Sequence, residues 1–151
     1  MYNAPDLVLE IPNDLASIEE VVEYVMEQCS GCGDDPRRLR LNLRVGLSEA
    51  LANAMLYGNA QDPSKSVRVE VAIKGTTITA KVTDEGRGFD PYHIPDPTAQ
   101  GNILKAEGRG IFLMRKLLDE VYFNDRGNSV TLVLRLPPDC EEGCVNGGAR
   151  A

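Results

Sequence analysis

Hydrophobic residues are spaced along this chain in two ways, and each spacing predicts a different secondary structure. In three segments they recur every three or four positions, as expected for amphipathic helices. In other short segments they alternate with polar residues or form brief apolar runs, as expected for strands. The predicted helices cover 13–29 and 35–58, with a third that begins at 108 and ends near 121, and the predicted strands cover 7–11, 67–73, 76–84, 121–123 and 130–136.

Turn and cap residues support these boundaries. Asn13 is the predicted N-cap of the first helix, and Asp35-Pro36 is typical of a capped helix start with proline in the first turn. Lys74-Gly75 joins two strands into an antiparallel hairpin, and Asp125-Arg126-Gly127-Asn128 does the same for the last two. The local pattern therefore predicts helices combined with antiparallel strands.

Two segments do not fit a regular element. Residues 90–107 contain three prolines and are long for a simple connection, which is typical of a lid over a binding site. A Pro-Pro pair at 137–138 ends the last strand, and a tail rich in glycine and glutamate follows. We predict one domain over 1–136 and a disordered tail over 137–151.

Composition excludes several classes of protein. The chain has 151 residues, of which 42% are hydrophobic and 26% charged, so one domain with an adequate core is expected. Its formal net charge of -7 argues against nucleic-acid or anionic-membrane partners, which require a basic surface. No apolar run is long enough to span a bilayer and the N-terminus has no basic region typical of a signal peptide, so we expect a cytoplasmic protein without membrane contact.

Four cysteines raise the question of a metal or redox site. Cys29 and Cys32 form a C-x-x-C pair, and Cys140 and Cys144 lie in the tail. One C-x-x-C alone is weak evidence for zinc, and this one lies at the predicted end of a helix, where the dipole disfavours a thiolate. Ordinary buried or surface thiols are the favoured interpretation.

The second helix carries two polar residues that need an explanation. Glu49 and Asn53 lie one turn apart in its later half, which is otherwise almost entirely apolar. Burying an unpaired carboxylate or amide costs on the order of several kcal/mol, so both residues must either pair locally or bind something. The simpler alternative is that Glu49 caps a loop and Asn53 satisfies a buried backbone group.

Two glycine-rich motifs suggest a nucleotide-binding site. Asp84-Glu85-Gly86-Arg87-Gly88-Phe89 follows a predicted strand, and Gly108-Arg109-Gly110 opens a predicted helix. Asp84 can accept a hydrogen bond from the adenine amino group, and the N–H groups of residues 108–111 can bind phosphate oxygens. Asn53 supplies an oxygen suited to Mg²⁺, and Glu49 can accept a proton from an attacking hydroxyl.

These motifs, together with Ser48-Glu49-Ala50-Leu51-Ala52-Asn53-Ala54, resemble the N box and the two glycine boxes of the GHKL ATPase superfamily. More narrowly, they are similar to the stand-alone anti-sigma-factor serine/threonine kinases of bacteria, over roughly 7–136. The resemblance implies an α+β fold of the Bergerat type. This fold is a two-layer sandwich in which helices pack on one face of a mixed, mainly antiparallel sheet.

The resemblance also implies a function. Members of that family bind ATP and Mg²⁺, sequester a sigma factor, and phosphorylate a STAS-type anti-anti-sigma protein; relatives often form homodimers. By motif position, Glu49 would be the general base, Asn53 the Mg²⁺ ligand and Asp84 the adenine contact. The backbone cradle would comprise Gly86, Gly88, Gly108, Gly110 and Ile111. Ser129 would help to hold the base, and the chemistry of phosphate binding adds Lys105 and Arg109.

One residue departs from the family pattern and keeps alternatives open. Tyr57 lies where relatives often carry a basic residue, four places after Asn53, and a phenol cannot supply that charge. A nucleotide-dependent binding module without kinase turnover is therefore the main alternative. The ATP-binding part of a histidine kinase is disfavoured because the only histidine, His93, lies in the proline-rich loop. A structural protein without nucleotide would make the glycine motifs coincidental turns.

Overall fold

The computed structural model describes residues 4–86 and 106–137. Residues 90–105 of the predicted lid and the predicted tail from residue 138 onward lie outside these ranges, whereas the last two lid residues, 106 and 107, belong to a helix. The strands are β1 (Leu7–Pro12), β2 (Ser66–Lys74), β3 (Thr77–Thr83), β4 (Glu120–Phe123) and β5 (Ser129–Arg135). The longer helices are α1 (Ile18–Gln28), α3 (Arg44–Asn53) and α4 (Ala106–Leu117), and the short helical segments are η1 (Leu15–Ser17), α2 (Pro36–Arg38), η2 (Leu39–Leu43) and η3 (Ala54–Gly58).

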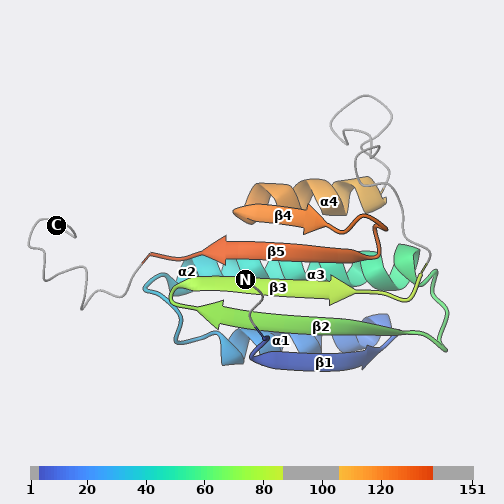
Figure 1. The fold of residues 1–151 in the computed structure, drawn as a ribbon, viewed down its shortest axis with the longest axis horizontal. Coiled ribbons are helices and arrows are strands. Elements are labelled where there is room, and N and C mark those ends of the chain that lie inside the picture. The colour runs from blue at the N-terminus through green and yellow to red at the C-terminus, as the bar shows by residue number, and fades with distance from the viewer. Residues whose placement is uncertain (1–3, 87–105, 138–151) are drawn as a thin grey trace, which may run out of the picture.

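The five described strands form one sheet in the order β1-β2-β3-β5-β4 (Figure 1). Every neighbouring pair is antiparallel. A two-residue turn joins β2 to β3. Its first residue, Gly75, has a positive φ of 61°, which is unfavourable for residues with a side chain. The β4–β5 hairpin returns to pair β5 with β3, so the end of β3 lies next to the start of β5.

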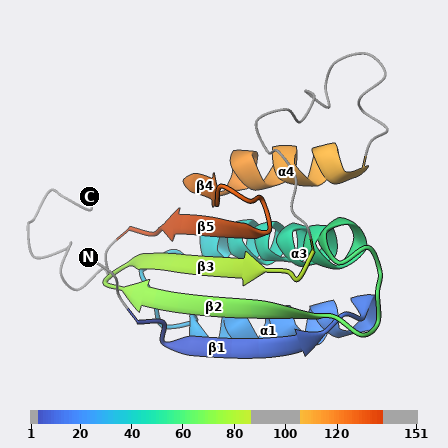
Figure 2. The ribbon, with the colours of Figure 1, turned by 45° about the vertical axis from the view of Figure 1, so that its right-hand side comes forward.

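The helices cover one face of this sheet, as Figures 1 and 2 show. The alternation in β2 buries Val67, Val69 and Val71 beneath the helices and leaves residues such as Arg68 on the opposite face. Helix α3 lies in the middle of the helical layer and contacts both α1 and α4. The predicted two-layer α+β architecture is confirmed.

The second predicted helix is one helical run from Pro36 to Gly58, formed by α2, η2, α3 and η3. Its predicted start is confirmed, because the Asp35 side chain accepts the backbone N–H of Arg38 at 2.9 Å. The η2 and η3 segments are π-helical turns on either side of α3. Such turns are frequently found at functional sites, and α3 is the segment that carries Glu49 and Asn53.

The predicted cap of the first helix was wrong. The Asp14 side chain, not that of Asn13, accepts the N–H of Ala16 at 3.1 Å and caps η1. The amide of Asn13 instead donates to the carbonyl oxygens of Asp62 and Met55, at 3.0 and 3.4 Å. The side chain that the local pattern assigned to the cap is therefore hydrogen-bonded to residues that are distant in sequence.

Candidate functional site

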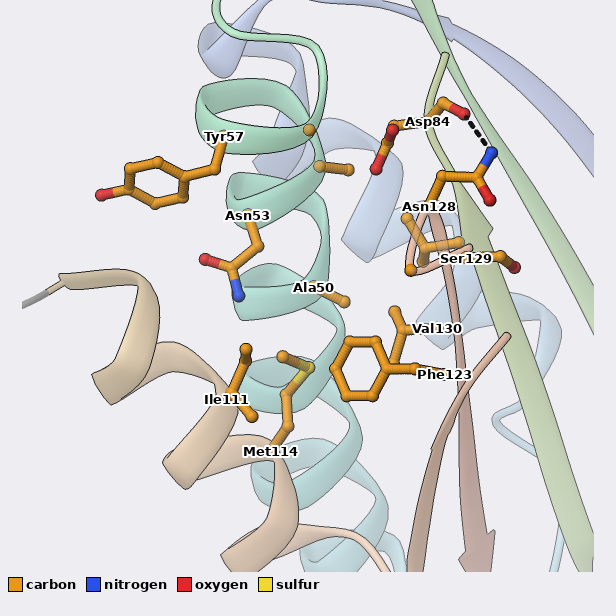
Figure 3. A pocket seen from close by; sticks show the side chains of 14 residues that line it. Ala50, Asn53, Tyr57, Asp84, Ile111, Met114, Phe123, Asn128, Ser129 and Val130 are labelled. Carbon is orange, nitrogen blue, oxygen red and sulfur yellow. Dashed lines mark hydrogen bonds between the residues drawn. The ribbon is translucent and has the colours of Figure 1, made fainter. Parts of the chain in front are cut away.

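A cavity of about 110 Å³ opens between the helical layer and one end of the sheet (Figure 3). A cavity needs only about 10–15 Å³ of such volume to hold one water, so this cavity can hold a larger group. Apolar side chains form much of its wall, with Ile111 and Met114 from α4 and Val82, Phe123 and Val130 from the sheet. Its other lining residues are Ala50, Asn53, Ala54, Tyr57, Gly58, Asp84, Gly127, Asn128 and Ser129.

Asp84 is the buried charge of this cavity, with only 8% of its surface exposed. Burial raises the pKa of the Asp84 carboxyl above its ordinary value, while the Gly86 N–H and the charges of Arg126 and Lys65 oppose the rise. The Gly86 N–H donates to Oδ1 at 2.7 Å, and the Asn128 Nδ2 donates to the Asp84 carbonyl at 3.2 Å (Figure 3). The carboxyl is therefore held firmly at the cavity wall.

Two glycines make room for this carboxyl. A Cβ on Gly58 would lie 2.2 Å from Asp84 Oδ2, and a Cβ on Gly86 would lie 1.7 Å from the Gly58 carbonyl oxygen. Neither position can carry a side chain without moving its neighbours. The end of the long helical run and the first glycine motif are thus in direct backbone contact beside Asp84.

Gly110 brings the second glycine motif against Glu49 and Asn53. A Cβ on Gly110 would lie 2.9 Å from Glu49 Oε1 and 3.3 Å from both Asn53 amide atoms. Asn53 lines the cavity, and both polar side chains are half-buried. No hydrogen bond or ion pair joins either side chain to another residue in the described ranges. The local pairing that would have explained them structurally is therefore not found there.

A comparison with known protein families gives the same picture. The family model described as histidine kinase-like ATPase domain matches residues 11–134, which include most of the fold and the whole cavity. The chain belongs to the histidine kinase-like ATPase domain family. Membership of this family implies an ATP-binding site. Four of the residues that the sequence assigned to such a site line the cavity of this ATPase domain, namely Asn53, Asp84, Ile111 and Ser129.

Individual relatives carry more specific names. An "Anti-sigma F factor" from Anoxybacillus flavithermus is 30% identical over 98 residues, which cover 60% of this chain and 64% of the relative. A "Serine-protein kinase RsbW" from Oceanobacillus iheyensis is 29% identical over 94 residues, covering 56% of this chain and 58% of the relative. The ATPase domain described here therefore spans about three fifths of the length of these two relatives.

Helix α4 of the ATPase domain begins earlier than predicted. It starts at Ala106 instead of Gly108. The unpaired N–H groups of a helix belong to its first turn, and Gly110 and Ile111 lie beyond that turn. The absence of a side chain at Gly110 lets α4 pack closely against α3, and the buried Ile111 lines the cavity. Arg109 is exposed on the same helix. Gly88 and Lys105 lie outside the described residues.

Ser129 lies at the cavity and also contacts a neighbouring strand. Its position lines the cavity, but its hydroxyl oxygen lies 3.1 Å from Thr83 Oγ1 on the neighbouring strand. Ser129 is buried in this arrangement. A direct contact of the hydroxyl with a base stays a prediction, and the hydrogen bond to Thr83 is the observed role.

Sequence reasoning missed the contribution of the β4–β5 turn. Asn128 bonds to the backbone of Asp84, and the Arg126 guanidinium donates to the Gly86 carbonyl at 3.1 Å. Both residues were interpreted only as turn formers. The presence of a charged residue and an amide in that turn was the only sequence signal of such contacts. The contacts themselves depend on the pairing of β5 with β3, which local patterns do not reveal.

The described residues do not form a metal cluster of their own. No group of three or more His, Cys, Asp or Glu side chains within residues 4–86 and 106–137 is arranged to hold a metal ion. Cys29 and Cys32 are buried, and burial, followed by the proximity of Cys32, raises the pKa of the Cys29 thiol to about 11. Neither cysteine forms a disulfide within the described part of the chain, in agreement with the favoured interpretation of this pair as ordinary buried or surface thiols. No helix in the same ranges is both long and apolar enough to cross a membrane.

Proposed function

We propose that the cavity binds ATP, with the adenine ring against the apolar wall and its amino group donating to Asp84. One observation carries this proposal: Asp84 and the Asn53 side chain line the same cavity, and Gly110 brings α4 within contact of Asn53 and Glu49. Apolar walls with a few fixed polar groups are typical of ligand pockets. The buried carboxylate supplies specificity for the base, and the half-buried pair on α3 faces the phosphates.

The same residues fit Mg²⁺. This ion usually takes one or two protein oxygens and completes its shell with water and substrate phosphates, so a three-carboxylate cluster is not required. Asn53 offers a neutral amide oxygen that is not engaged by a described neighbour, and Glu49 lies one turn earlier. When bound, the ion would neutralise charge on the phosphates, while Asn53 holds its position.

We further propose that the protein is a serine/threonine kinase and an anti-sigma factor, as the names of its relatives suggest. Glu49 accepts the proton of a serine or threonine hydroxyl on a STAS-type anti-anti-sigma protein. The hydroxyl oxygen forms a bond to the γ-phosphorus as the bond to the bridging oxygen of ADP breaks. The phosphorylated anti-anti-sigma protein would then let go, which would leave this protein free to sequester its sigma factor.

The kinase proposal is tested by following label from [γ-³²P]ATP to candidate STAS proteins. Wild type should transfer the label, and Glu49→Gln should retain ATP binding while transfer falls by at least about 10²-fold, the effect typical of a lost general base. Asn53→Ala should lose both. Transfer that persists in Glu49→Gln would remove Glu49 as the base.

A second candidate is an ATP-dependent binding module that does not turn over. Tyr57 favours it, because this neutral phenol lines the cavity one turn after Asn53 and is 44% exposed. ATP binding without label transfer to any STAS candidate, but with ATP-dependent binding of a sigma factor, would support the module. Label transfer would exclude it.

A further inference from the structure

Asn59 follows directly after η3, and its side chain connects three segments of the chain. The residue is fully buried, at 0% exposure. Its Nδ2 donates to the Ser66 carbonyl at 2.9 Å and to Asn13 Oδ1 at 3.2 Å, while its Oδ1 accepts the backbone N–H of Glu85 at 2.7 Å. The amide thus ties the end of the helical run to β2, to the β1–η1 connection and to the first glycine motif.

The bond to Glu85 reaches the part of the site that recognises the base. Glu85 lies between Asp84 and Gly86, whose N–H holds the Asp84 carboxyl. The Glu85 carboxylate also accepts the N–H of Ser66 at 2.8 Å, so both bonds anchor this motif beside the start of β2. The orientation of the Asp84 carboxyl therefore depends on a peptide that Asn59 holds.

Steric contact also couples the position of the Asp84 carboxyl to the end of the helical run. The backbone of Gly58 touches both Asp84 and Gly86, so neither the helix end nor the glycine motif can shift far without displacing the carboxyl. On the other side of the motif, Asn128 and Arg126 still hold Asp84 and Gly86. Loss of the Asn59 bond should therefore tilt the segment while leaving it attached.

We propose that Asn59 is a positioning residue that orients the Asp84 carboxyl toward the base, acting through the N–H of Glu85. The proposal rests on the proposed function, in which Asp84 accepts the adenine amino group. The two ends of the amide do different work. The Nδ2 donors hold the fold together, and the Oδ1 acceptor holds the recognition segment.

The test is the ratio of the dissociation constant for ITP, which lacks the amino group, to that for ATP, both measured by calorimetry at one Mg²⁺ concentration. A hydrogen bond to a charged group corresponds to a preference of about 10- to 100-fold, which wild type should show for ATP. In Asn59→Ala the ratio should fall to within about threefold of unity. The matched control is Asn13→Ala, which removes a partner of Asn59 Nδ2 but keeps the Glu85 bond; it should lose stability and retain the ratio.

Asn59→Asp keeps the proposal testable if Asn59→Ala does not fold. Its carboxyl retains an acceptor for Glu85 and loses the Nδ2 donors, and burial favours the neutral form that the fold tolerates. It should retain the wild-type ATP preference despite lower stability. An unchanged ratio in Asn59→Ala would overturn the proposal. So would a loss of the preference for ATP in Asn59→Asp and Asn13→Ala that equals the loss in Asn59→Ala.

Hydrogen exchange separates this inference from the proposed function. Without nucleotide, the amide hydrogens of residues 85 and 86 should exchange at least about tenfold faster in Asn59→Ala than in Asn13→Ala, because only the first variant releases the Glu85 N–H. If wild type binds no ATP but this difference is seen, the proposed function fails and the positioning holds. If wild type prefers ATP and the exchange rates are equal, the positioning fails and the function stands.

Discussion

Replacing Gly110 by alanine should separate the stability of this protein from its activity. The added Cβ would lie 2.9 Å from Glu49 Oε1 and 3.3 Å from both Asn53 amide atoms, whereas ordinary contacts of a Cβ are 3.4–4 Å. Glu49 Oε1 is the far end of a flexible side chain, so the side chain can rotate away while the backbone stays in place. Alanine is also favoured over glycine within a helix by roughly 1 kcal/mol.

Two effects of opposite sign follow. The free energy of unfolding should stay the same or rise by up to about 1 kcal/mol, which chemical denaturation measures. Phosphotransfer should fall by about 10²-fold, because displacing a catalytic group by about 1 Å has an effect of that size. Affinity for Mg²⁺-ATP should fall less, since the Asn53 atoms need to move only slightly.

Gly46→Ala is the matched control on the neighbouring helix. Its Cβ would lie 2.3 Å from Leu118 Cδ2 in the core between α3 and α4, away from the cavity lining. Overpacking of this kind costs about 1–3 kcal/mol, so this variant should lose stability and retain ATP affinity. If Gly110→Ala retained wild-type transfer and affinity, the assignment of Glu49 and Asn53 to the phosphate side of the site would be refuted.

Three further predictions concern single residues. Asp84→Asn should raise the free energy of unfolding at pH 7 and abolish the preference for ATP over ITP. The raised pKa of Asp84 means that ionisation opposes folding, so the gain should appear only as the pH rises above the unfolded-state value of about 4 and should vanish below it; pH-dependent denaturation would show this. Ala60→Gly should stabilise the fold by about 0.5–1 kcal/mol in denaturant titrations, because Ala60 has a positive φ of 52°, and a loss of stability would contradict the strain. Cys29, with a pKa of about 11, should resist iodoacetamide at pH 8 in the native protein, and its alkylation before unfolding, seen by peptide mass spectrometry, would contradict the buried thiol.

Local patterns were sufficient for most of the secondary structure. The capped start at Asp35 and the end at Gly58 match the long helical run, and the predicted strands lie within a residue or two of those observed. These features depend on neighbours in sequence, namely side-chain periodicity and turn residues. The start of α4 was missed by two residues, because two glycines within a helix favour placing the boundary at them.

Contacts between distant segments account for the features that sequence did not predict. Asn13 is an ordinary N-cap candidate until Met55 and Asp62 approach it in the folded chain. The roles of Asn128 and Arg126 depend on β5 pairing with β3 across an inserted helix and strand. Residue types and motif order thus predicted the site, but its supporting contacts required the fold.

The most direct test of the central claim is a calorimetric titration of Mg²⁺-ATP into wild type and Asn53→Ala, with the fold of each checked by circular dichroism. Wild type should bind, and Asn53→Ala should stay folded while its affinity falls at least about tenfold, the size expected for a lost charge-assisted contact. A well-folded wild type that binds no Mg²⁺-ATP, or an Asn53→Ala variant with unchanged affinity, would contradict the account of the cavity as a magnesium-nucleotide site.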